Sequence, residues 1–179
     1  MRVIAGSAKG VRLAPVPAGI RPLSDRAREG LFSSLGGSVE GQAWADLFAG
    51  TGAVGIEALS RGAGSCLFVD SSAHAVRTIR ENLDRTGLGH RARVIRADAD
   101  RGLLRAEGPL DTVFLDPPYR LASGRLREVL VTATTAAPGG TLVLTRPSRD
   151  PTDVIPVHWG SVKVLTYGDA RILICREAR

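Results

Sequence analysis

The chain has 179 residues, 44% of them hydrophobic and 23% charged, which is enough for one domain with a substantial core. Two cysteines, three histidines without metal-ligand spacing and the lack of a long apolar run predict a reduced, cytoplasmic protein with no metal and no membrane span. A net charge of +6 favours a polyanionic partner, although a basic surface without a partner would also explain it.

Residues 1–22 are predicted to form a basic β-hairpin extension ahead of a main domain over residues 23–179. The extension has no acidic residue and four basic ones: Arg2, Lys9, Arg12 and Arg21. Apolar residues alternate on both sides of residues 6–10, which predicts a hairpin with a basic tip. We expect it to contact RNA. The alternative is that it only covers a sheet edge, and the two roles are compatible.

A helix is predicted over residues 24–36. Ser24 or Asp25 can cap its first turn, and Ala27 and Leu31 recur at helical spacing. These features indicate an amphipathic helix that precedes the first core strand.

Residues 43–48 are predicted to form a buried strand that leads through a glycine loop into a helix over 53–62. Gly50 and Gly52 allow the backbone to approach a ligand closely, and the helix start points N–H groups at an anion. The loop also matches GxGxxG, a weak indication of a dinucleotide. Asp46 opposes that interpretation, because a carboxylate at the strand tip would repel a pyrophosphate but accept from an ammonium. S-adenosylmethionine (SAM), with its α-amino group and sulfonium, fits this arrangement.

Two more apolar strands, over 65–70 and 92–97, flank a helix predicted over 72–86. Asp70 ends the first of them, 20 residues after Gly50, the spacing at which an acid accepts from ribose hydroxyls. Asp98 follows the second strand and can face the amino group of adenine. Any single acid here could be a strand-end residue or a helix cap. Four acids at four strand ends fit that alternative poorly.

The fourth acid belongs to the most informative stretch, Asp116–Tyr119 (DPPY), which follows an apolar strand predicted over 111–116. Open α/β sheets bind ligands at the carboxyl ends of their strands. Two consecutive prolines lack N–H groups, so the corner they form can only accept hydrogen bonds. A carboxylate on one side and an aromatic ring on the other suit a planar group that bears an NH2. A Pro-Pro turn beside an ordinary core tyrosine is the alternative.

The rest of the chain continues the alternation of strands and helices. It is predicted to contain a short helix before residue 111, a helix over 122–135, a strand over 140–145, a loop over 147–160, and an antiparallel pair over 162–166 and 170–176. The pair must be antiparallel because only the turn Tyr167-Gly168-Asp169 joins it. The order predicts a doubly wound α/β fold with a mostly parallel sheet.

Residues 2–6, the segment RPLSDRAREGLF, the loop DLFAGTGAVGIEALSRGA and DPPY together resemble the RsmD family. These are bacterial class I SAM-dependent methyltransferases that modify guanine N2 in 16S ribosomal RNA, and the resemblance covers essentially the whole chain. It implies a seven-stranded sheet, SAM as cofactor, no metal and a monomer. It also implies 16S rRNA in a 30S subunit or assembly intermediate as partner, with guanine 966 in conventional rRNA numbering as the target.

We therefore expect three sets of site residues. The catalytic set is the acceptor motif: Asp116, Pro117, Pro118 and Tyr119. The cofactor set follows the strand ends: Asp46, Phe48, Gly50, Thr51, Gly52, Asp70, Asp98 and Ala99. The substrate set is basic: Lys9, Arg12, Arg21, Arg26, Arg120 and Arg125.

Other function classes remain open at this point. A nicotinamide-dependent dehydrogenase would use the same glycines, but an evident catalytic set is missing and Asp46 opposes it. A non-catalytic RNA-binding module in ribosome assembly would not need DPPY. Among methyltransferases, the alternative is a DNA enzyme that acts on adenine N6 or cytosine N4. A protein glutamine methyltransferase resembles an Asn-Pro-Pro-Tyr pattern instead.

Overall fold

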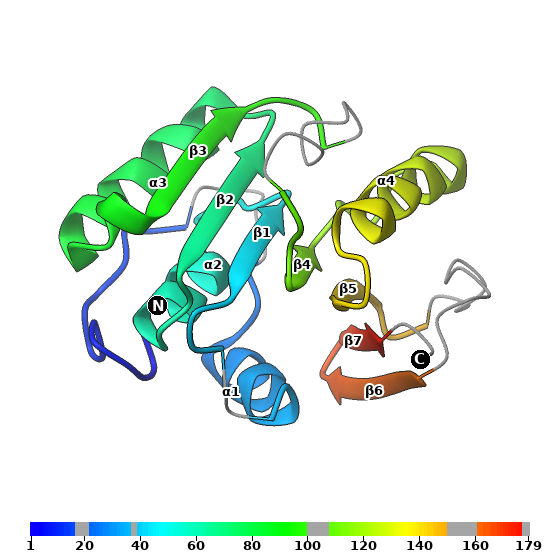
Figure 1. Cartoon of the computed structure of the whole chain (residues 1–179), viewed down its shortest axis with the longest axis horizontal. Helices are drawn as coiled ribbons and strands as arrows, with labels where there is room; N and C mark the ends of the chain where they lie inside the picture. Colours follow the sequence, from blue (N-terminus) through cyan, green and yellow to red (C-terminus); the bar gives the residue numbers. More distant parts are fainter. Residues whose placement is uncertain (17–21, 37–38, 100–107, 150–160, 177–179) are drawn as a thin grey trace.

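The computed structural model describes residues 1–16, 22–36, 39–99, 108–149 and 161–176, and these build one sheet with helices on both faces (Figure 1). The helices are α1 (Asp25–Ser34), α2 (Ala53–Ser60), α3 (Ala73–Thr86) and α4 (Ser123–Ala136), with a 3-10 turn η1 (Gly89–Arg91). The strands are β1 (Ala43–Leu47), β2 (Ser65–Asp70), β3 (Ala92–Arg96), β4 (Thr112–Leu115), β5 (Thr141–Pro147), β6 (Ser161–Tyr167) and β7 (Ala170–Arg176).

The strand order is β3-β2-β1-β4-β5-β7-β6. The first five strands are parallel, and β7 pairs antiparallel with both β5 and β6. The predicted seven-stranded, doubly wound sheet is therefore confirmed. The chain order reverses between β1 and β4, which is the position where open α/β sheets form a ligand crevice.

Most predicted boundaries agree with the observed ones within two residues. Strand β5 extends to Pro147 rather than ending at 145, because its antiparallel register with β7 continues to the Pro147–Ala170 pair. The short helix expected before β4 and most of the predicted loop over 147–160 fall outside the described residues.

Each face of the sheet carries its own hydrophobic core. Helices α1, α2 and α3 cover one face, where Phe32, Ile56 and Ile79 pack with Trp44 and Phe68 of the strands. Helix α4 covers the other face, where its apolar side packs on alternate residues of β1, β4 and β5. All eight residues of α2 are buried, so α2 is the helix most deeply enclosed by its neighbours.

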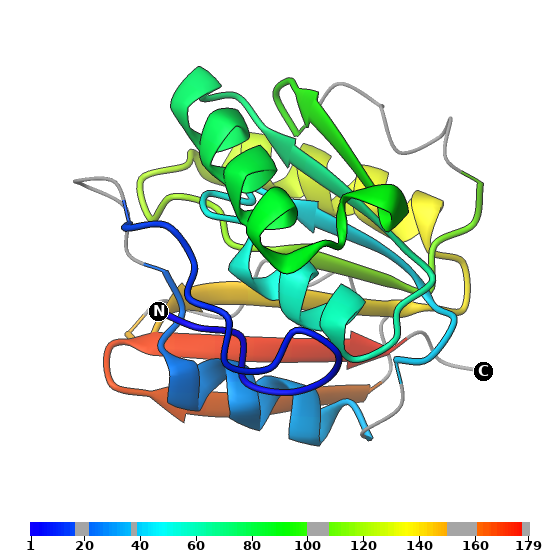
Figure 2. The same cartoon turned by 90° about the vertical axis from the view of Figure 1, so that its left-hand side faces the viewer.

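The N-terminal segment forms less regular structure than the predicted hairpin. Its described residues contain a single antiparallel bridge, between Arg2 and Arg12, and the turn between them packs on the C-terminal end of α2. Gly6 has φ +84°, and a Cβ there would lie 1.8 Å from the Ser60 carbonyl oxygen. Val3 and Leu13 are buried in the same core as α1 and α2. The segment, which loops across α2 in Figure 2, therefore has a packing role.

A buried carboxylate joins this segment to two helices. Glu57 of α2 is fully buried and accepts from the backbone N–H groups of Ile4 (2.8 Å) and Ala5 (3.0 Å). It also accepts from Arg61 Nε (2.7 Å) and from Nη1 of the equally buried Arg28 of α1 (3.5 Å). Nη2 of Arg28 in turn donates to the Arg2 carbonyl at 2.8 Å.

Within the described residues, no helix is long and apolar enough to cross a membrane, and no group of histidine, cysteine or acidic side chains could hold a metal ion. Cys66 and Cys175 are both buried and unpaired.

Glu57→Ala should lower the free energy of unfolding by about 3–5 kcal/mol, because it leaves the Ile4 and Ala5 N–H groups without an acceptor and removes the buried carboxylate beside Arg28. Denaturant unfolding measures the change. Glu81→Ala is the matched control: Glu81 pairs with Arg85 on the surface of α3, with side chains 53% and 42% exposed, and should change stability by less than about 1 kcal/mol. Equal effects of the two substitutions would contradict the role given to Glu57.

Candidate active site

The four predicted acids lie at or close to the carboxyl edge of the sheet. Asp70 is the last residue of β2, Asp116 directly follows β4, and Asp98 comes two residues after β3. Asp46 is one residue short of the end of β1, so it does not form the strand tip as predicted. Asp46, Asp70 and Asp116 lie on or directly after neighbouring strands, since β1 pairs with both β2 and β4.

Asp46 is buried between β1 and the start of α2. Its Oδ2 accepts from the Gly55 N–H at 3.0 Å, while its Oδ1 is buried and has no hydrogen-bond partner in the described part of the chain. Burial is the main cause that raises its pKa well above 3.8, and the Gly55 hydrogen bond partly offsets this. An acceptor without a donor is suited to a ligand that brings one.

The glycine loop between β1 and α2 has an unusual backbone. Gly50 and Gly52 have φ of 56° and 73°, and Phe48 has φ 59°, which is rare for a residue with a side chain. Strained backbone of this kind concentrates at ligand sites. Asp70 holds the loop, since its Oδ2 accepts from the Gly50 N–H at 2.8 Å while Oδ1 accepts from the Ser72 N–H at 2.8 Å.

Asn82 supports the loop from α3 and was not predicted. Its Nδ2 donates to the carbonyl of the buried Thr51 at 2.8 Å, and its Oδ1 accepts from the Ala14 N–H at 2.7 Å. It lies on the apolar side of α3 with Ile79 and Leu83. The sequence signal that could have identified Asn82 is a polar amide on the otherwise apolar side of a predicted helix.

The predicted adenine side of the site is less completely described. Asp98 is half-buried, and Ala99 is buried in the core that α4 covers. Residues 100–107, which follow, are outside the described part of the chain, so the adenine contacts of Asp98 and Ala99 stay predictions.

The acceptor motif forms the corner after β4. Asp116 is partly buried and accepts from the hydroxyl of Thr145 on β5. Burial raises its pKa from 3.8 to about 6, against the lowering effect of that hydrogen bond. Pro117 is buried, and the Pro118 carbonyl accepts from the Leu121 N–H at 2.8 Å. Tyr119 is 44% exposed, which excludes the alternative of an ordinary core tyrosine.

A cleft of about 360 Å³ opens beside this corner. Asp116, Tyr119 and Thr145 form one wall, the first turn of α1 contributes Ser24 and Ala27, and the β6–β7 turn contributes Tyr167 and Asp169. The sequence identified the Tyr167-Gly168-Asp169 turn but did not place it at the site. Gly30 makes that placement possible, because a Cβ there would lie 1.7 Å from the Tyr167 hydroxyl.

The predicted RNA-binding residues are distributed over the surface. Lys9, Arg12, Arg26, Arg120 and Arg125 are all exposed, and Arg21 lies outside the described residues. Lys9 and Arg26 line a second, smaller cleft, and neither is among the residues that line the acceptor cleft.

Comparison with known proteins decides the family. Residues 1–176 match the family described as "Conserved hypothetical protein 95". The chain belongs to this family. The protein YlbH of Bacillus subtilis (strain 168), named as a candidate rRNA methyltransferase, is 44% identical over 124 residues, which are 67% of each chain. The Ribosomal RNA small subunit methyltransferase D of Escherichia coli (strain K12) is 37% identical over 132 residues, 73% of this chain and 65% of that protein.

A solved structure extends the likeness to the whole chain. The Escherichia coli methyltransferase candidate yhhF matches with a TM-score of 0.81 and 31% identity, over 100% of this chain and 99% of that one. The chain is therefore an RsmD-family methyltransferase with SAM as its cofactor, which confirms the predicted family, enzyme class and cofactor. The dehydrogenase and the non-catalytic module are excluded as its class.

Asp116→Asn should make the protein more stable near pH 7, by on the order of 1–2 kcal/mol. The folded-state pKa of about 6 lies above the ordinary 3.8, so the contribution of this group to stability is full below pH 3.8 and is lost as the pH rises through about 6. Asparagine avoids that loss and still accepts from Thr145. Thermal unfolding of the variant and the parent protein across a pH series measures the difference in stability.

The stability difference between Asp116→Asn and the parent should vary with pH across that range. A stability difference that is the same at every pH would contradict the effect assigned to the raised pKa of Asp116. Asp84→Asn, an exposed substitution on α3, is the control and should leave the stability curve unchanged.

Proposed function

We propose that this protein transfers the methyl group of SAM to the exocyclic N2 of a guanine in 16S rRNA, guanine 966 by family resemblance. The observation that carries the proposal is the acceptor cleft, which Asp116 and Tyr119 line at the carboxyl edge of the sheet. The Asp116 N–H donates to the carbonyl of Leu47 at 3.3 Å, at the end of β1 where the glycine loop begins. The names of the relatives support an rRNA substrate.

The cofactor residues would hold SAM across the glycine loop. Asp46 and the loop residues Phe48, Gly50, Thr51 and Gly52 would contact its methionine end, Asp70 its ribose, and Asp98 with Ala99 its adenine. The unpaired Oδ1 of Asp46 and the positive φ of three loop residues fit this arrangement. Bound SAM supplies a strongly electrophilic methyl group on a sulfonium.

The acceptor corner would then orient the amine. Asp116 and the Pro117 carbonyl accept the two N–H bonds of the guanine amino group and direct its lone pair at the methyl carbon. The carbon–nitrogen bond forms as the sulfur–carbon bond breaks, and the sulfur leaves as a neutral thioether. Positive charge that develops on N2 is stabilised by the carboxylate. The N2 proton then leaves to Asp116 or to water.

The second carboxylate of the cleft favours guanine over the other amino bases. Asp116 and Asp169 both line the cleft, and carboxylate oxygens accept hydrogen bonds. Guanine presents N1–H beside its N2 amino group, so two neighbouring donors meet two acceptors. Adenine and cytosine carry a ring-nitrogen acceptor beside their amino group, which a carboxylate would repel. This chemistry disfavours the DNA methyltransferase alternative.

Entry of the base requires that it leave its stack. The exposed ring of Tyr119 gives a flipped guanine a surface to stack on, and the basic residues Arg120 and Arg125 extend from the same corner. We propose that a monomer acts in the cytoplasm, on a 30S subunit or an assembly intermediate.

Mass spectrometry of nucleosides from 16S rRNA tests the function. Small subunits from a deletion strain should lack one N2-methylguanosine, and the purified protein with SAM should restore it. Asp116→Ala should abolish the transfer and leave SAM affinity within a few fold. Undiminished turnover by Asp116→Ala, or methylation of another atom, would refute the proposal.

The guanine selection has its own test within this assay. Asp169→Asn should reduce the turnover of RNA that has guanine at the target position. It should also reduce the ratio of that turnover to the turnover of RNA with 2-aminopurine at this position, because 2-aminopurine lacks the N1–H donor. An unchanged preference would remove Asp169 from the assignment and leave Asp116 untouched.

Asp70→Ala should weaken the binding of SAM and of its demethylated product alike, by about 1.5–3 kcal/mol, the usual value for hydrogen bonds to a charged group. Loss of the Gly50 contact would add to this, because the loop depends on the same carboxylate. Calorimetric titration measures both affinities. Normal binding would contradict both the ribose contact and the effect of the loop, and would leave Asp70 as an ordinary strand-end residue.

A further inference from the structure

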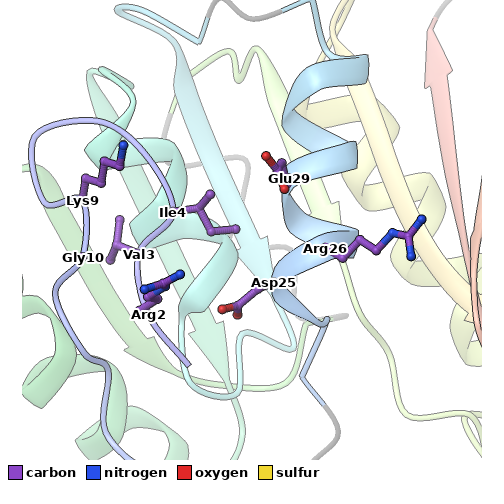
Figure 3. A pocket seen from close by; sticks show the side chains of 8 residues that line it. All are labelled: Arg2, Val3, Ile4, Lys9, Gly10, Asp25, Arg26 and Glu29. Carbon is purple, nitrogen blue, oxygen red and sulfur yellow. The ribbon is translucent and has the colours of Figure 1, made fainter.

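A second cleft, of about 280 Å³, lies between the N-terminal segment and α1. Figure 3 shows Lys9 and Gly10 on the side of the N-terminal segment and Glu29 projecting from α1, with Arg2 and Asp25 lying near each other. None of the residues that line it lines the acceptor cleft. Nothing in the reaction proposed above uses it.

Buried hydrogen bonds fix both walls of this cleft. Arg28, which is fully buried behind it, donates to the Arg2 carbonyl at 2.8 Å on one wall and to Asp25 Oδ1 at 2.7 Å on the other. The Ile4 N–H, next along the first wall, is held by Glu57 at 2.8 Å. A cleft with fixed walls binds a ligand without the entropic cost of ordering them.

The two walls differ in charge. Arg2 and Lys9 provide cationic donors from the N-terminal segment, while Asp25 and Glu29 of α1 provide carboxylate acceptors. Arg26 of α1 also lines the cleft, but its side chain points away from the N-terminal segment in Figure 3. A simple anion would meet the carboxylates, and a simple cation would meet the basic residues. A nucleotide suits both walls, because it combines an anionic phosphate with a base edge that carries N–H donors. The net charge of +6 further favours a polyanion over a peptide.

The position of the cleft connects it to the acceptor site. Ser24 and Ala27 of the first turn of α1 face the acceptor cleft, while Asp25 and Glu29 of the same helix face the second one. The two clefts therefore lie on different sides of one helix, and a helix with its side chains is about 10–12 Å across. An RNA strand that inserts its guanine beside Asp116 and crosses this turn would bring a neighbouring nucleotide to the second cleft.

We propose that the second cleft binds a nucleotide that flanks the target guanine, with its phosphate on Lys9 and Arg2 and an amino-bearing base on Glu29. This inference rests on the proposed function for the identity of the RNA. The residues of the second cleft would then select the nucleotide that flanks the target guanine, in addition to strengthening RNA binding. They lie outside the predicted cofactor-binding residues.

The test uses the full chain, SAM and a short single-stranded RNA with one guanine, compared with versions in which each flanking nucleotide is abasic. Lys9→Gln should weaken RNA binding about 5- to 10-fold and reduce the slope of log affinity against log salt by about 0.7. The parent should lose affinity at one abasic position. Glu29→Gln should bind the intact and the abasic RNA equally at that position, and SAM affinity should stay unchanged in both variants.

Lys163→Gln is the matched control, since Lys163 is the other lysine of the chain and lies exposed on β6, away from both clefts. RNA binding unchanged in Lys9→Gln, or weakened no more than in Lys163→Gln, would overturn the proposal. An abasic effect that Glu29→Gln retains would also overturn it. A loss of affinity in these variants that appears with small subunits but not with the short RNA would assign the cleft to a protein partner instead. Binding is read without methyl transfer, so failure of the proposed reaction would appear separately, in the nucleoside analysis.

Discussion

The buried Glu57 carboxylate is the interaction on which the arrangement of both clefts depends. Its two backbone partners belong to the N-terminal segment and its two arginine partners to α1 and to the end of α2. A carboxylate without water must be satisfied by several donors, so these three parts of the chain cannot shift independently. Since α2 also begins at the glycine loop, the same carboxylate links the cofactor loop to the walls that would receive RNA.

At the carboxyl edge of the sheet, two carboxyl groups are buried at a cost to the stability of the fold. Asp46 and Asp116 both have a pKa raised by burial, so the fold disfavours the charged form of each carboxyl group. The adjacent ends of β1 and β4 bring these groups together, and their mutual repulsion adds to the cost. Groups of this kind accept strongly from a donor that excludes water, as an ammonium or a base amine does. The destabilisation is therefore consistent with a site that binds donors.

The sequence predicted the elements well because their signals are local. Apolar runs that end in an acid located β1, β2 and β4, and the turn at Gly168 and Asp169 located the antiparallel pair. The contributions of Thr145, Tyr167 and Asn82 could not be predicted in this way, since each depends on a partner distant in sequence. The two arms of the predicted hairpin do pair, through the Arg2–Arg12 bridge and backbone hydrogen bonds such as that from the Val3 N–H to the Val11 carbonyl, but the paired stretch is short. Alternation predicted a ladder, while hydrogen bonds to Ser60 and Glu57 of α2 take up part of its backbone.

Helix α1 carries most of the segment RPLSDRAREGLF of the family resemblance, which lies outside the cofactor-binding motifs. The glycine loop and the acids at the strand ends would serve any reaction of SAM, whereas α1 lines the acceptor cleft and the second cleft. Its first turn divides the two clefts, Arg28 fixes the N-terminal segment, and Gly30 admits the Tyr167 hydroxyl. In the proposed reaction, selection of the acceptor would therefore rest partly on an element that the methyl-transfer chemistry itself does not require.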